Sequence, residues 1–221
     1  MDILLLRHGE NDYTRKGRLA GLLPGVHLNE AGQKQAQALA ARLSRAPLKA
    51  VYSSPQERAM ETARPLADAL RLEVQICDEV HELDCGAWTG RSLKQLARTR
   101  LWRDVQQRPS RWQFPEGETF LAAQTRAVLA VERMAPAHRK DLIAVITHAD
   151  VIKLVVAYYL GLPLDLFQRL VISTGSITAL RLGQGQPALV KLNDTGPLPA
   201  SPHDMPRKTP RRLNTHGGIH V

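Results

Sequence analysis

Four side chains of this sequence could bind and attack a phosphate group. Arg7 and His8 follow an apolar run at residues 2–6, Arg58 stands near the start of a predicted helix, and His148 follows an apolar run at 142–147. A guanidinium binds phosphate through a planar fork, and a neutral imidazole can act as a nucleophile. In an open α/β sheet, ligands bind beyond the carboxyl ends of the strands. These residues predict an anion site that contains a nucleophile, although Arg7-His8-Gly9 by itself also fits an ordinary turn.

A carboxylate stands close to the same predicted strand ends. Glu82 lies in HELDCGAWTG, just after the apolar run at 72–76. Among phosphate-binding cations, a carboxyl group that stays protonated could give its proton to a leaving alkoxide. Glu79 and Asp84 are close competitors for this role, and an exposed loop carboxylate is the alternative interpretation.

The elements that must position these side chains alternate between strands and helices. Strands are predicted at 2–6, 48–52, 72–76, 142–147, 170–174, 177–182 and 188–192. Helices are predicted from an Asn29 cap to Ser44, from Pro55 to Leu70 with Ser53 or Ser54 as cap, at 118–134 and at 150–160. This order predicts a three-layer α/β/α fold, in which a mostly parallel sheet carries helices on both faces. The closing strands, around Gly175, could add an antiparallel edge.

Two segments depart from this alternation of strands and helices. Residues 83–117 hold a basic helix candidate at 92–107 and form a plausible substrate cap inserted beside the strand ends. Trp88, Trp102 and Trp112 are expected to pack there, although a cap could use one of them to hold a ligand. The chain is expected to form one domain over 1–195, followed by a disordered, basic, proline-rich tail at 196–221.

Composition restricts the class of protein. The 221 residues are 43% hydrophobic and 23% charged, which is ordinary for a soluble globular protein. Cys77 and Cys85 are expected to be free thiols in a reducing compartment. No apolar run is long enough for a membrane span or a signal peptide. A cytoplasmic protein without a membrane partner is therefore expected. The net charge of +9 is concentrated at 91–111 and in the tail. Because these regions lack a series of aromatic residues, an anionic small molecule explains the charge as well as a polynucleotide does, and no nucleic-acid partner is expected.

Several stretches together resemble the histidine phosphatase superfamily, the phosphoglycerate-mutase-like proteins. They are LLLRHGE, GRLAGLLPGVHLNEAGQKQA, VYSSPQERAMETA, HELDCGAWTG, FPEGET and VITHADVI, in this order over residues 2–182. The resemblance implies that His8 takes the phosphoryl group, that Arg7, Arg58 and His148 hold its oxygens, and that Glu82 protonates the leaving group. It also places Gly9, Thr14 and Ala149 in substrate binding, with no metal or other cofactor.

Three departures from the family pattern bear on the reaction. Thr14 stands where the family often has a phosphate-contacting Asn, Leu83 stands where mutases typically have an Arg, and His148-Ala149-Asp150 replaces His-Gly-Asn. The last two favour a phosphatase that hydrolyses small phosphomonoesters through a phosphohistidine. The alternatives are a phosphoglycerate-type mutase and a catalytically weak basic scaffold. The expected partner is a small phosphorylated substrate, and the chain is expected to be a monomer or a homodimer.

Overall fold

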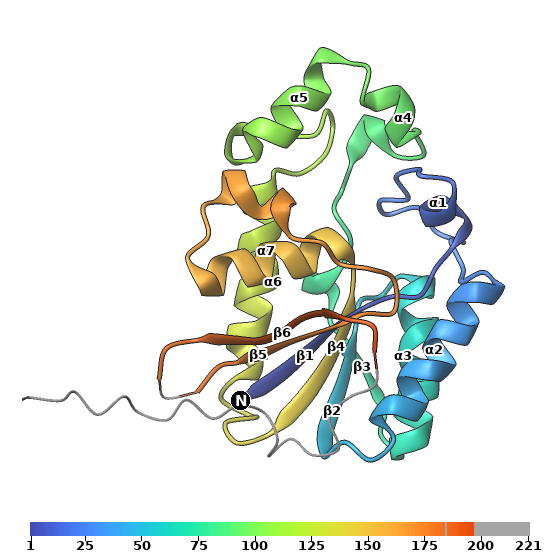
Figure 1. Ribbon diagram of the computed structural model, residues 1–221, viewed down its shortest axis with the longest axis vertical. Helices are drawn as coiled ribbons and strands as arrows, with labels where there is room; N and C mark the ends of the chain where they lie inside the picture. The colour runs from blue at the N-terminus through green and yellow to red at the C-terminus, as the bar shows by residue number, and fades with distance from the viewer. Residues whose placement is uncertain (184, 197–221) are drawn as a thin grey trace, which may run out of the picture.

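The sheet of this protein has a parallel body and an antiparallel edge. The structure is a computed structural model that describes residues 1–183 and 185–196. Six strands lie in the order β3-β2-β4-β1-β5-β6 (Figure 1). The parallel ones are β1 (Asp2–Arg7), β2 (Leu48–Ser53), β3 (Val74–Ile76) and β4 (Leu142–Thr147); β5 (Ile177–Arg181) and β6 (Ala188–Asp194) run antiparallel to their neighbours β1 and β5. The predicted sheet and its antiparallel edge are confirmed.

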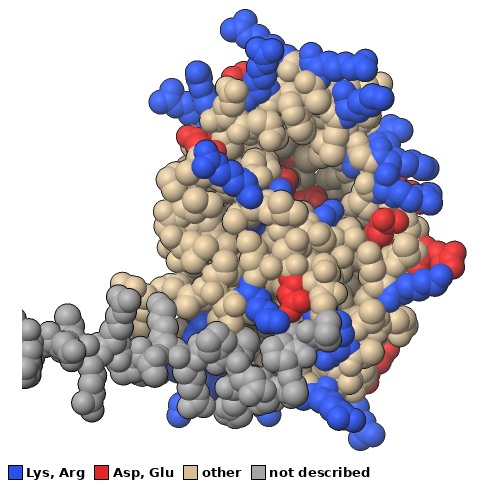
Figure 2. Space-filling model, in the orientation of Figure 1, with Lys and Arg blue, Asp and Glu red and all other residues tan. Residues whose placement is uncertain are grey.

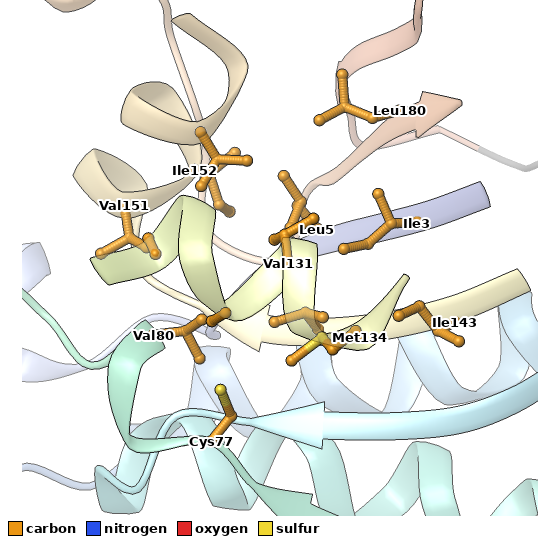
Figure 3. Packing of buried hydrophobic residues seen from close by; sticks show 14 of the residues in the cluster. Ile3, Leu5, Cys77, Val80, Val131, Met134, Ile143, Val151, Ile152 and Leu180 are labelled. Carbon is orange, nitrogen blue, oxygen red and sulfur yellow. The ribbon is translucent and has the colours of Figure 1, made fainter. Parts of the chain in front are cut away.

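Helices cover both faces of the sheet, as predicted. α2 (Glu30–Leu43) and α3 (Glu57–Leu70) lie on one face, and α6 (Phe120–Met134) and α7 (Ala149–Leu160) lie on the other (Figure 1). Along β1, Ile3 and Leu5 pack into the cluster under α6 and α7, while Leu4 and Leu6 pack into the cluster under α2 and α3. Figure 3 shows the first of these clusters. An unbroken apolar strand is expected where both faces of a sheet are buried.

Residues 83–117, which we call the cap segment, lie beyond the carboxyl ends of the parallel strands (Figure 1). The segment holds α4 (Leu93–Leu96) and α5 (Arg100–Gln107), with short 3₁₀ turns at Gly86–Trp88 and Pro109–Arg111. The prediction of one helix over 92–107 is wrong, because the Thr99 side chain accepts a hydrogen bond from the Trp102 backbone N–H and starts a new helix there. A separate apolar cluster joins the cap segment to α6 and α7.

Two further predictions about local structure are wrong. In both places the residues contact a side chain of the predicted site instead of forming the predicted element. Residues 170–174 form no strand, and the Ile172 carbonyl instead accepts a hydrogen bond of 2.7 Å from Arg7 Nη1. Helix α3 begins at Glu57 rather than Pro55, with Gln56 at its N-cap. Ser54 does not cap this helix, because its hydroxyl lies 2.7 Å from His148 Nε2.

The remaining elements are short. Helix α1 (Asp12–Arg15) follows β1, and 3₁₀ turns lie at Asp78–Val80 and Leu164–Arg169. Cys77 and Cys85 are free and buried, as expected. Of the predicted tail only Gly196 is described, and 197–221 lie outside the described residues. No helix in the described ranges is long and apolar enough to cross a membrane.

Candidate active site

Three neighbouring strands bring the predicted site together. β1, β4 and β2 lie side by side in parallel, with Arg7 in register with Thr147, and Ser53 in register with Ile146. The residues that follow these strands therefore meet at one edge of the sheet, where the ring centroids of His8 and His148 are 5.1 Å apart. The first turn of α3 adds Arg58 at the same edge.

His8 is held as a neutral imidazole with one nitrogen free. Its Nδ1 lies 2.7 Å from the Gly9 carbonyl oxygen, and because a carbonyl only accepts, Nδ1 carries the proton. The unprotonated Nε2 is then available to attack. Burial lowers the pKa of His8 well below its usual value, and the positive charges of Arg58 and Arg7 lower it further. The site thus favours the nucleophilic form of the ring.

Gly9 lies behind the site rather than in it. Its N–H donates to Thr62 Oγ1 at 3.0 Å, its carbonyl holds His8, and it does not line the cavity described below. A Cβ on Gly9 would lie 2.5 Å from the Gly32 carbonyl oxygen, so only glycine allows this close approach of the backbones. The sequence places Gly9 in substrate binding, whereas the structure gives it the task of orienting His8.

Two buried guanidiniums carry donors that no described residue satisfies. Arg58 is fully buried and donates through Nη2 to the Gly21 carbonyl at 2.9 Å, while its Nη1 has no partner within the described residues. Arg7 Nε is likewise buried without a partner there. Burial lowers the pKa of both groups, and the carboxylate of Glu82 opposes this. Because an unmet buried donor is costly, an anion that accepts from both arginines would be strongly favoured.

His148 contacts the site from behind. Its Nε2 lies 3.0 Å from Gln56 Oε1, which only accepts, so Nε2 carries the proton. Its Nδ1 lies 3.4 Å from Arg58 Nη2 and 3.5 Å from Glu82 Oε2. Burial, with Arg58 next, lowers the pKa of His148 well below its usual value. Sequence reasoning missed the support from Ser54 and Gln56 because the SSPQ stretch also fits a helix cap.

Of the three candidate carboxylates, only Glu82 lies in the site. Burial raises its pKa; the positive charge of Arg58 opposes this shift, and the negative charge of Asp150 adds to it. Glu79 instead forms an ion pair with Arg133, and Asp84 Oδ1 accepts from the Gly86 N–H at 3.0 Å. Neither lines the cavity.

The loop that carries Glu82 is fastened by a residue that sequence reasoning did not single out. Arg126, on α6, donates to the carbonyls of Glu79, His81 and Glu82 at 2.7, 2.9 and 3.2 Å. It also pairs with Glu118 at 2.7 Å. No motif marked Arg126, because its loop partners are backbone atoms that only the fold brings near.

The neighbourhood of Thr14 differs from the family-based expectation. The Thr14 hydroxyl donates to the Asn11 carbonyl at 2.8 Å, so its proton is already used. Asn11 is fully buried, and its Oδ1 accepts from the Thr14 N–H at 2.9 Å. The Asn11 Nδ2 has no partner within the described residues, and Asn11 lines the cavity. Nothing in the sequence distinguished Asn11 from Thr14 as the free donor.

These groups surround a cavity of about 190 Å³, which we call the site cavity. Of the eight predicted site residues, six line it, while Gly9 and His148 lie behind the wall; the six are Arg7, His8, Thr14, Arg58, Glu82 and Ala149. Ala149 is the first residue of α7, where backbone N–H groups have no partner within the helix. Figure 2 shows a hollow below the cap segment, with charged side chains at its mouth.

The charges of the site suit an anion better than a metal ion. His8, Glu82 and His148 offer nitrogen and oxygen atoms within 4.8 Å of one another. The guanidiniums of Arg7 and Arg58 occupy the same cavity and would repel a cation. A phosphate dianion meets no such repulsion and would satisfy the unpaired donors.

Comparison with known families agrees with this geometry. The sequence profile of the histidine phosphatase superfamily (branch 1) matches residues 3–195. This chain belongs to the histidine phosphatase superfamily. The family resemblance inferred from the motifs is therefore confirmed.

Relatives within the superfamily include both phosphatases and mutases. Phosphoserine phosphatase 1 of Hydrogenobacter thermophilus is 30% identical over 87% of this chain and 92% of its own. A 2,3-bisphosphoglycerate-dependent phosphoglycerate mutase of Thermoplasma acidophilum is 28% identical over 83% of this chain and 88% of its own. Among solved structures, YhfR of Bacillus stearothermophilus superimposes with a TM-score of 0.82, at 25% identity, over 88% of this chain and 98% of its own. The superfamily membership thus supports the phosphoglycerate-mutase-like fold.

Proposed function

We propose that this histidine phosphatase hydrolyses small phosphomonoesters, without a metal ion, through a phosphohistidine at His8. The observation that carries the proposal is the Nδ1–H···O bond from His8 to Gly9, which leaves Nε2 free beside the unpaired donors of Arg7 and Arg58. The buried thiols Cys77 and Cys85 fit a reducing compartment, and we place the reaction in the cytoplasm.

In the first step, His8 Nε2 attacks the phosphorus and the bond to the ester oxygen breaks. Arg7, Arg58 and the Asn11 amide donate to the non-bridging oxygens, which carry the charge of the transition state. His148 supports this arrangement through its contacts with Arg58 and Glu82. Glu82, whose pKa is raised by burial, acts in its protonated form and gives its proton to the leaving alkoxide.

In the second step, water replaces the imidazole. Glu82, now a carboxylate, takes a proton from a water molecule that attacks the phosphorus. The bond between His8 Nε2 and phosphorus breaks, inorganic phosphate leaves, and the site returns to its starting state. The fixed cations and donors supply the charge stabilisation that a metal ion would provide elsewhere.

Hydrolysis is favoured over mutase activity by the lining of the cavity. A mutase needs cations that grip the rest of a phosphoglycerate while it turns around. Leu83, at the position of the mutase Arg, is buried in the wall and has no hydrogen-bond donor on its side chain. The seven cations at 91–111 are all exposed, and none lines the site cavity; Arg18 does line it, with its Nε bonded to the Gly90 carbonyl. The similarity to a mutase at 28% identity keeps the mutase as the second candidate.

The decisive experiment traps the intermediate. Acid-labile, base-stable phosphate should appear on the wild-type protein after rapid denaturation with labelled substrate, and His8→Ala should lose both the label and turnover. Circular dichroism would check that the variant is folded. Full activity of His8→Ala would overturn the mechanism.

A second assay separates the two reactions. With 3-phosphoglycerate, primed by 2,3-bisphosphoglycerate, we expect no appreciable formation of 2-phosphoglycerate. Phosphate release should instead be found in a screen of small phosphomonoesters with a metal chelator present. Isomerisation well in excess of phosphate release would make the mutase the better assignment.

A further inference from the structure

A second cavity lies beside the site cavity, beneath the cap segment. Its volume is about 410 Å³, and we call it the cap chamber. Both cavities share Arg7, Leu19, Leu93, Phe114, Ala149 and Asp150 in their walls, so the chamber lies next to the phosphate site. A phosphomonoester bound at His8 can therefore extend its alcohol portion into the chamber.

The walls of the cap chamber are largely apolar and aromatic. Trp88 and Trp102 stack with ring centroids 6.2 Å apart and 23° between their planes, and Phe114 meets Trp88 edge to face at 5.6 Å. Val105 closes the chamber from α5, and Val171, which is 66% exposed, stands at its rim. Flat aromatic walls of this kind bind rings and other apolar groups through burial and stacking.

Of the two described cations in the chamber wall, Arg7 is assigned to the phosphate and Lys153 already has partners, which leaves neither for a carboxylate. Lys153 Nζ donates to Asp150 Oδ1 at 2.9 Å and to Gln168 Oε1 at 3.2 Å, so its charge is already paired. Asp150 stands at the junction of the two cavities, and because its carboxylate is the partner of Lys153, the pair offers no net charge to a leaving group. Arg18, the other cation besides Arg7 and Arg58 in the wall of the site cavity, does not line the chamber, and its Nε donates to the Gly90 carbonyl.

We propose that the cap chamber binds the leaving group of the substrate, and that this group is an uncharged alcohol with a ring or similarly bulky apolar portion. This inference rests on the proposed phosphatase activity and adds the class of substrate. Esters whose alcohol carries a net negative charge, such as 3-phosphoglycerate, are poor substrates on this account.

The test compares three primary alkyl phosphates, which all need a proton on the leaving oxygen. They are 2-phenylethyl phosphate, glycerol 3-phosphate and 3-phosphoglycerate, assayed by phosphate release. We expect kcat/KM for 2-phenylethyl phosphate to exceed that for 3-phosphoglycerate by about tenfold or more, the range that differential burial of an apolar group gives. Equal values for the three esters, or a preference for 3-phosphoglycerate, would overturn the proposal.

Two variants and a matched control locate the preference. Trp102→Ala should lower kcat/KM for 2-phenylethyl phosphate by about tenfold while changing that for glycerol 3-phosphate less than about twofold, since only the first alcohol reaches the aromatic wall. Val171→Ser, at the exposed rim, should show the same selectivity to a smaller extent without endangering the fold. Leu101→Ala, on the same helix but outside the chamber wall, should leave both esters unchanged.

The outcomes separate this inference from the proposed function. If no ester releases phosphate and no phosphohistidine forms, the phosphatase proposal fails. If phosphate is released but Trp102→Ala and Val171→Ser affect all esters alike, the enzyme is a phosphatase and the assignment of the chamber is wrong.

Discussion

Burial acts in opposite directions on the two titratable groups that carry out the proposed chemistry. It lowers the pKa of His8, whose charged form is a cation, and raises the pKa of Glu82, whose charged form is an anion. A neutral imidazole and a protonated carboxyl group can therefore coexist over a wider range of pH than free side chains would allow. Burial thus shifts both groups toward the protonation states that the proposed reaction needs.

Replacement of Glu82 by Gln tests its proposed role as acid. The amide has no proton of suitable acidity, so alkyl phosphates should lose activity on the order of 100-fold more than aryl phosphates, whose leaving groups need no proton. The measurement is kcat/KM for 2-phenylethyl phosphate and 4-nitrophenyl phosphate. Glu79→Gln, a carboxylate outside the cavity, is the control and should resemble the wild type. An equal loss on both esters would show that Glu82 is structural.

The pH dependence of the wild type follows from the same two groups. With an alkyl phosphate, kcat/KM should fall on the alkaline side as Glu82 loses its proton, and on the acid side as His8 gains one. Because the pKa of Glu82 is raised, the alkaline fall should begin above the ordinary range of a carboxyl group. An aryl phosphate should lack the alkaline fall, and identical profiles for the two esters would contradict this assignment.

Asn11 and Thr14 can be separated by substitution. Asn11→Ser keeps an oxygen that can cap α1 but removes the Nδ2 donor, so inhibition by inorganic phosphate should weaken about tenfold, the equivalent of one hydrogen bond to a charged group. Thr14→Ser keeps the internal hydrogen bonds of the hydroxyl and should bind phosphate as the wild type does. Unchanged inhibition of Asn11→Ser would leave Arg7 and Arg58 as the main phosphate donors.

At the scale of elements, the site depends on how loops are fastened to the sheet and helices. Helix α3 starts at Glu57 rather than at the predicted Pro55, because the side chains of Ser54 and Gln56 form hydrogen bonds with His148. Residues 170–174 leave the sheet, and Ile172 holds Arg7. In both cases, residues that could have lengthened a helix or a strand instead hold a side chain of the site in position.

The hydrogen bonds from Arg126 to the loop that carries Glu82, which we call the Arg126 clamp, can be tested by substitution. Arg126→Met removes three hydrogen bonds to the loop that carries Glu82, so the free energy of unfolding should fall by about 2–3 kcal/mol. The ratio of alkyl to aryl phosphatase activity should also fall, because a loosened loop misplaces the acid but not the nucleophile. Arg133→Met, which removes a half-exposed ion pair with Glu79, should cost less than about 1 kcal/mol and leave the ratio unchanged. A stability loss without a change in the ratio would make the clamp merely structural.

At the scale of the whole molecule, the cap segment lies beyond the strand ends of the three-layer body. Most of the charged side chains of the cap segment face the solvent. Lys and Arg side chains gather over the cap segment in Figure 2. The seven Lys and Arg residues at 91–111 are exposed, while the apolar side chains of the cap segment pack against α6 and α7. The cap segment therefore presents apolar walls to the site and positive charge to the solvent.

The last described strand, β6, is tied to the body by Asp194. Asp194 pairs there with Lys191 at 2.7 Å and with Arg42 at 3.4 Å. A chain that ends at Gly196 should keep its activity and its melting temperature to within about 2 °C, or about 1 kcal/mol, since the proline-rich residues beyond offer little to bury. Thermal unfolding and the phosphatase assay would check this, and a drop of several degrees would show that the tail stabilises the body.

The sequence by itself determined the sheet, the covering helices and the family, because buried strands read as apolar runs and the motifs follow one another in order. It also named the residues at the strand ends, since ligand sites in such sheets lie there. Only the tertiary structure selected Glu82 over Glu79 and Asp84, and Asn11 over Thr14 as a free donor. The reason is that burial and hydrogen bonding depend on neighbours far along the chain, such as Arg126 behind Glu82 and Thr62 behind Gly9, which local sequence does not encode.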